Sequence, residues 1–154
     1  RFEDLLLPFA AVAVDVGSGE EVVLRSGDLA RAIRASCSVP GIFEPVVVGD
    51  RLLVDGGLLN DVPADVARSL ADGPVFAVKL NGGWREPARP RSIFDVISAS
   101  LAIVALHGIQ RGLEAADLVV APELGHASYR NLSKVDELAT AGERAAREAL
   151  AAAP

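Results

Sequence analysis

The residues with the clearest chemical potential are an aspartate and two glycines at the end of an apolar segment. Leu52–Val54 leads into Asp55, and Gly56 and Gly57 follow it directly. Two glycines after an acid permit backbone conformations that other residues resist, and they let another group approach closely. Such a turn fixes one carboxylate at a defined point. Taken alone, Asp55 could equally close a β-turn, so its role depends on the residues around it.

Nucleophiles that could work with this carboxylate are hard to find. No serine lies in a G-x-S-x-G strand-to-helix elbow. Ser18 stands between two glycines and two expected strands, which favours a plain hairpin turn, and Asp15 is expected to close that same turn. Cys37 lies in a Ser-Cys-Ser context close to a proline, and we expect it to be a small buried residue rather than a nucleophile.

Two histidines and a glycine-rich loop supply weaker alternatives. His107 falls in a long apolar helical stretch, where a satisfied or half-exposed histidine is the ordinary case. His126 follows a strand and precedes the final helix, so Asp55 and His126 would fit the Ser, Asp, His order of an α/β-hydrolase triad. Residues 82–85, Gly-Gly-Trp-Arg, resemble an oxyanion-hole loop, although a surface loop is the simpler interpretation.

The elements that must position these residues alternate between strands and helices. Strands are predicted over 10–16, 21–24, 45–48, 51–54, 75–80 and 118–121, and helices over 28–34, 63–70, 92–115 and from 133 onward. This alternation indicates an α/β layer structure in a single domain over 1–154. The first four strands form two hairpins, which predicts a mixed sheet rather than a purely parallel one.

Capping signals set the ends of the first and last helices. Asp28 is expected to cap the first helix, with Leu29 and Ile33 on its buried side. The sequence 133–136, Ser-Lys-Val-Asp, has the capping-box pattern and opens the last helix. Glu143 and Arg147 are spaced to pair on the exposed side of that helix. Its expected buried residues are Val135, Leu138, Ala141 and Ala145.

Composition excludes several classes of protein. The chain has 154 residues, of which 51% are apolar and 23% charged, so it suits one well-filled globular domain and not a disordered tail. The net charge is −6, without a dense cluster of basic residues, which argues against nucleic acid as a partner. This acidity also argues against electrostatic docking on anionic lipid, but it leaves hydrophobic contact with a membrane open.

Cysteine and hydropathy patterns set the expected compartment. One cysteine forms no internal disulfide, and no His/Cys spacing suggests zinc, so we expect a cytoplasmic protein without a metal or cofactor. The longest apolar run, 96–106, is too short to span a bilayer. The chain begins with Arg1 and contains no methionine, which predicts a fragment or a processed piece of a longer protein.

Two segments at a characteristic spacing resemble the C-terminal half of a bacterial patatin-like phospholipase. They are residues 30–45, ARAIRASCSVPGIFEP, and residues 55–63, DGGLLNDVP. Further likeness extends over 2–15, 116–122 and 136–142. The two motifs at this spacing are specific, whereas Asp-Gly-Gly alone would be weak.

The resemblance implies a three-layer α/β/α fold, of which the C-terminal part is present here. It also implies a lipid acyl hydrolase with a Ser–Asp dyad, in which Asp55 is the acid/base member and Gly56 and Gly57 shape the turn. The serine elbow and the oxyanion loop belong to the family's N-terminal half, so this chain alone is predicted to be inactive. A lipid or acyl ester is the expected substrate, with attachment to the membrane periphery left open.

Two other functions stay open from the sequence. The chain could be a non-catalytic module that keeps the same half-fold to bind a lipid or a protein. It would then leave apolar surface uncovered, and association into dimers is expected. A Ser-Asp-His hydrolase fragment using His126 is the weaker alternative.

Overall fold

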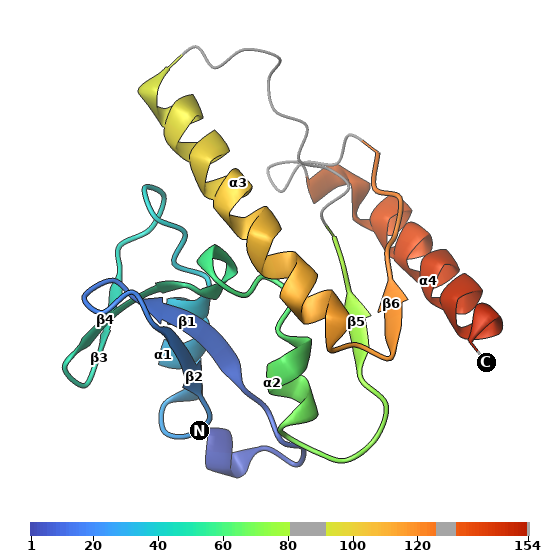
Figure 1. Cartoon of the computed structure of the whole chain (residues 1–154), viewed down its shortest axis with the longest axis horizontal. Coiled ribbons are helices and arrows are strands. Elements are labelled where there is room, and N and C mark those ends of the chain that lie inside the picture. Colours follow the sequence, from blue (N-terminus) through green and yellow to red (C-terminus); the bar gives the residue numbers. More distant parts are fainter. Residues whose placement is uncertain (81–91, 126–131, 154) are drawn as a thin grey trace.

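The computed structural model describes residues 1–80, 92–125 and 132–153, and these residues form two sheets flanked by helices (Figure 1). The larger sheet has the strand order β2-β1-β4-β3 and is antiparallel throughout. Its strands are β1 (Ala11–Asp15), β2 (Glu21–Leu24), β3 (Val46–Val48) and β4 (Arg51–Asp55). The smaller sheet pairs β5 (Phe76–Val78) in parallel with β6 (Leu118–Val120). The α/β class is confirmed, but parallel and antiparallel pairs lie in separate sheets among the described residues, rather than in one mixed sheet.

Strand β1 is the centre of the larger sheet, and all five of its residues are buried. Helix α1 (Leu29–Ser36) packs on this sheet through Ala32 and Ala35. Asp28 caps α1 as expected, because its side chain accepts a hydrogen bond from the Arg31 N–H at 3.0 Å. The prediction that Ile33 lies on the buried side of α1 was wrong, because Ile33 is exposed. The two alanines face the sheet instead, since their small side chains allow close packing.

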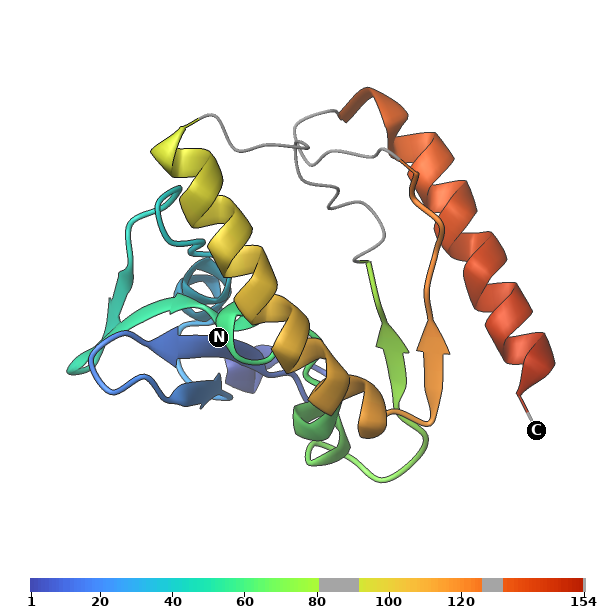
Figure 2. The same ribbon diagram turned by 45° about the horizontal axis from the view of Figure 1, so that its top comes forward.

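Helix α3 (Ile93–Glu114) crosses the molecule between the larger sheet and β5, and α4 (Val135–Ala152) lies on the other side of β6 (Figures 1 and 2). The β5–β6 pair is therefore covered by a helix on each side, as in a three-layer α/β/α fold. The core between α3 and β5 contains Val75, Ala77 and Ile109. Strand β5 is buried on one face only, because Ala77 is buried whereas the alternating residues Phe76 and Val78 are exposed.

The final helix packs more loosely than expected. A short 3-10 turn (Leu132–Lys134) precedes α4 and places Lys134 at the N-cap position, where no side-chain cap hydrogen bond forms. The predicted cap, Ser133, is therefore one residue early, and α4 itself begins at Val135. Val135 is exposed, and no residue of α4 is fully buried. The predicted pair of Glu143 and Arg147 is confirmed, with nitrogen and oxygen 2.8 Å apart.

The apolar part of helix α3 is longer than residues 96–106. By length and composition alone, α3 is long and apolar enough to cross a membrane, because an 18-residue window of it has a mean hydropathy of 1.7. The earlier expectation considered only residues 96–106. Helices in the interior of proteins pass the same test, so this property assigns no membrane span to α3.

Two glycines let α3 approach the loop that connects β4 to helix α2 (Ala64–Arg68). A Cβ on Gly108 would overlap the carbonyl oxygen of Leu59, and a Cβ on Gly112 would overlap that of Val62. The two glycines are four residues apart, so they lie on the same face of the helix. That face is the one that contacts the loop.

We predict opposite effects for two glycine-to-alanine substitutions in helices. Gly142→Ala in α4 meets no atom within 4 Å of the new methyl group, so it should stabilise the protein by about 0.5–1 kcal/mol through helix propensity. Gly112→Ala gains the same propensity but forces α3 away from Val62, with an expected net loss of about 1–3 kcal/mol. Urea unfolding of both variants measures the difference, and equal effects would show that close packing at Gly112 is unimportant.

Candidate functional site

Asp55 ends β4 at the centre of the candidate site, and its backbone is fixed on both sides. It pairs with Ala13 of β1 in the antiparallel register. Its N–H donates to the carbonyl oxygen of Ser38 at 3.0 Å. Ser38 is fully buried, and its hydroxyl donates to the Arg34 carbonyl at 2.7 Å. The segment after α1 therefore sets the position at which β4 delivers its carboxylate.

The two glycines after Asp55 have different tasks. A Cβ on Gly56 would overlap the carbonyl group of Val12, so no side chain fits there. The N–H of Gly57 donates to Oδ1 of Asp55 at 2.8 Å, which fixes the carboxylate at the start of the 3-10 turn Gly56–Leu58. Neither glycine has a positive φ. Close approach of the β1 backbone therefore explains Gly56, and at Gly57 the nearest atoms to a Cβ would be carboxylate oxygens of Asp61 and Asp55.

The surroundings of Asp55 raise the pKa of its carboxyl. Burial of the carboxyl raises its pKa, and the negative charge of Asp61 raises the pKa further, whereas the hydrogen bond from the Gly57 N–H lowers it. The net direction is upward. Oδ2 of Asp55 makes no hydrogen bond to the described residues, so this oxygen is available to an incoming donor.

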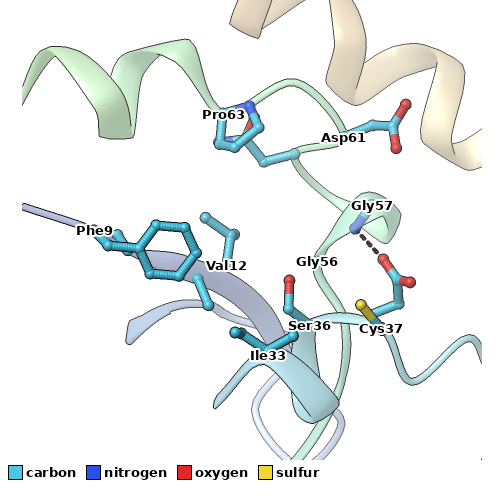
Figure 3. A pocket seen from close by; sticks show the side chains of 13 residues that line it. Phe9, Val12, Ile33, Ser36, Cys37, Gly56, Gly57, Asp61 and Pro63 are labelled. Carbon is cyan, nitrogen blue, oxygen red and sulfur yellow. Dashed lines mark hydrogen bonds between the residues drawn. The ribbon is translucent and has the colours of Figure 1, made fainter. Parts of the chain in front are cut away.

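The carboxylate lines an open pocket of about 370 Å³. Asp61, Gly57 and Cys37 lie along one side of the pocket, and Phe9, Val12, Ile33 and Pro63 lie along the other (Figure 3). The pocket thus combines a polar side that holds the carboxylates with an apolar side. Such a combination suits a ligand with an apolar chain next to a polar reacting group.

Asn60 is a structural centre of the loop whose role the sequence did not reveal. It is 2% exposed, and its amide nitrogen donates to the carboxylates of Glu21 at 3.0 Å and Asp65 at 2.9 Å. Asp65 in turn pairs with Arg111 of α3. Asn60 therefore connects the loop to β2, α2 and α3. A buried asparagine cannot be identified as such from its residue type, since most asparagines are exposed.

Three other candidates from the sequence, Asp15, Ser18 and His107, lie outside the pocket. Asp15 and Ser18 belong to the β1–β2 turn, as predicted: the carboxylate of Asp15 accepts hydrogen bonds from the Gly17 N–H at 3.1 Å and the Ser18 hydroxyl at 3.2 Å. His107 is exposed on α3, with Nδ1 3.0 Å from the Ile103 carbonyl oxygen. None of these three residues lines the pocket that contains Asp55.

Cys37 does not match its prediction, because it is exposed at the C-cap of α1 and lines the pocket. This exposure could not be predicted from the residue type, since free cysteines are usually buried. His126 and the loop 82–85 lie outside the described residues. Among the described residues, no group of three or more His, Cys, Asp and Glu side chains could hold a metal ion.

Comparisons with known proteins identify the class of protein. A sequence model of the patatin-like phospholipase family matches residues 5–68, which include α1, the sheet of β1 to β4, Asp55 and its loop. An NTE family protein of Mycobacterium tuberculosis is 30% identical over 99% of this chain and 30% of its own length. A second one from the same species is 46% identical over 56% of this chain and 24% of its own length.

The likeness extends to mammals. Patatin-like phospholipase domain-containing protein 7 of the mouse is 40% identical over 64% of this chain and 7% of its own length. The chain belongs to the patatin-like phospholipase family. It spans about a third or less of the length of these curated relatives.

We predict that the charge on Asp55 destabilises the folded chain near neutral pH. Because the pKa is raised on folding, the folded state holds the proton more tightly than the unfolded state. This unfavourable contribution is absent below the ordinary aspartate pKa, grows as the pH rises from that value to the raised one, and stays constant above it. Asp55→Asn, which keeps an oxygen to accept from Gly57, should therefore raise the melting midpoint by about 1–4 °C near pH 7 and change it little near pH 3. Calorimetry at both pH values tests this, and equal midpoints at about pH 7 would contradict it.

Proposed function

We propose that this chain supplies the aspartate of a serine acyl hydrolase that cleaves ester bonds in lipids. The observation that carries the proposal is the state of Asp55. Its carboxylate is half-buried, it is held through Oδ1 by the Gly57 N–H, and it has a second oxygen without a partner among the described residues. It lies in a pocket with an apolar side formed by residues such as Phe9 and Ile33. Membership of the patatin-like phospholipase family supports a lipid as the substrate.

Asp55 acts in this proposal as the general base and orienting acid of a Ser–Asp dyad. The serine hydroxyl attacks the ester carbonyl carbon, and its proton passes to Oδ2 of Asp55. The bond from the carbonyl carbon to the leaving oxygen then breaks, and the proton passes to that oxygen. Water then attacks the acyl-serine and gives a proton to Asp55. The bond from the acyl carbon to the serine oxygen breaks, Asp55 returns the proton to that oxygen, and the carboxylic acid leaves. A carboxylate with an ordinary pKa is a poor base for a hydroxyl, so partial burial improves the match.

The nucleophile and the oxyanion-stabilising N–H groups come, in this proposal, from polypeptide outside residues 1–154. The sequence contains no G-x-S-x-G elbow, and the chain spans 30% of the length of its mycobacterial relative. Residues 1–154 then form one part of a single catalytic domain. Peripheral membrane attachment, a cytoplasmic location and dimer formation stay predictions from the sequence.

Substitution of Asp55 in the full-length gene product tests the proposal. We expect hydrolysis of a short acyl ester by the full-length protein and none by residues 1–154 alone. Asp55→Asn should lower kcat/KM by about 10²–10⁴, the usual contribution of a positioned base. Asp50→Asn is the matched control, because it removes the same charge from the exposed β3–β4 turn, at the opposite end of β4 from Asp55, and should leave the rate unchanged.

Other outcomes separate the alternatives. An Asp55→Asn protein that retains full activity would overturn the dyad, and a concurrent loss of activity in His126→Ala would favour a Ser-Asp-His triad. A full-length protein without esterase activity that binds lipid vesicles or a protein would favour the non-catalytic module.

A further inference from the structure

A second carboxylate faces Asp55 across Gly57. A Cβ placed on Gly57 would lie 2.9 Å from Oδ1 of Asp61 and 3.1 Å from Oδ1 of Asp55. The two oxygens are therefore about 6 Å apart or less, within the range over which one charge alters the proton affinity of another. A side chain at Gly57 would come between them. The glycine keeps this space open, so the two charges interact directly.

We propose that Asp61 is a further residue of this site, whose negative charge strengthens Asp55 as the proton acceptor of the dyad. The inference rests on the proposed function, since it assigns Asp61 a task in the same reaction. Asp61 does not exchange a proton with the substrate. Its negative charge acts on the Asp55 carboxylate, and only Asp55 contacts the reacting groups.

The charges around the pocket leave Asp61 as the main partner of Asp55. Among the described residues, the ionisable ones that line the pocket are Asp55, Asp61 and Cys37, with no lysine or arginine. Burial is the largest cause of the raised pKa of Asp55, and Asp61 is the charged group among the described residues that raises it further. A carboxylate next to another carboxylate holds a proton more tightly, because ionisation of both places like charges close together.

The charged groups on the neighbouring elements are committed to other contacts. Glu21 of β2 and Asp65 of α2 both accept from the Asn60 amide, and Arg111 of α3 pairs with Asp65. Arg34 of α1 donates to the Ser38 hydroxyl and the Glu44 carbonyl. The nearby positive charges are thus held by groups other than the Asp55 carboxylate.

The first test is a direct titration of this chain. Carbon-detected NMR of the aspartate carboxyl groups in residues 1–154 should give a lower pKa for Asp55 in Asp61→Asn than in the unmodified chain. Asp61→Glu keeps the charge and should restore most of the effect, and Asp50→Asn should have none. This measurement needs no activity. An Asp55 titration that is unchanged in Asp61→Asn would overturn the inference whether or not the protein is a hydrolase.

The second test is the pH profile of the full-length gene product. Asp61→Asn should shift the acid limb of kcat/KM to lower pH and lower the plateau by about 2- to 10-fold, because a weaker base transfers the proton less well. In Asp61→Glu, the acid limb of kcat/KM should stay at the same pH as in the unmodified protein. A plateau loss without a shift of the limb would indicate a merely structural role and would overturn the assignment. Failure of the proposed function looks different, because then either the unmodified full-length protein would have no esterase activity or Asp55→Asn would remain active.

Discussion

The loop of residues 55–63 depends on how closely other backbone segments approach it. Strand β1 contacts it at Gly56, where the carbonyl of Val12 occupies the space that a side chain would need. Helix α3 contacts it twice, because the carbonyls of Leu59 and Val62 lie against Gly108 and Gly112. Backbone against backbone leaves little room for adjustment, since no flexible side chain can move to relieve a clash. The position of the Asp55 carboxylate follows from these three contacts.

Asn60 adds a polar constraint to this steric one. Its amide nitrogen faces two carboxylates, which fixes the orientation of the amide because an oxygen there would be repelled. Oδ1 then points the other way and has no partner among the described residues, so burial of Asn60 costs free energy. The hydrogen bonds of Asn60 compensate for this cost, because they connect the loop to β2 and α2 and, through Asp65, to α3. The steric contacts set the distance of the loop from β1 and α3, and the hydrogen bonds of Asn60 set its orientation relative to β2 and α2.

The sequence predicted those parts of the fold that depend on local signals. Turn residues and alternating apolar residues located the strands, and Asp28 located the start of α1, because caps and turns involve neighbours in the chain. The parts that failed depend on distant packing: Ile33 is exposed because alanines face the sheet, and Cys37 is exposed because α1 ends at the pocket. The spacing of Gly108 and Gly112 in an apolar helix was a usable signal of close packing. Which loop packs there could not be known before the fold.

Asp15 and Asp55 show why the local motif alone could not identify the site. Both residues end antiparallel strands of the same sheet, and both accept a hydrogen bond from the N–H of the glycine two positions later. The pKa of Asp15 is lowered, chiefly by the hydrogen bond from Gly17 and with help from Ser18. The pKa of Asp55 is raised, because burial and Asp61 outweigh the equivalent bond from Gly57.

An aspartate that only closes a turn, such as Asp15, does not need surroundings that raise its pKa, as those of Asp55 do. Placing a carboxylate where its charged form is disfavoured makes folding less favourable near neutral pH. The same environment makes the group a better proton acceptor. The difference between two turns that share one hydrogen-bonding pattern therefore lies in the pocket around Asp55, and that difference is what a catalytic role would require.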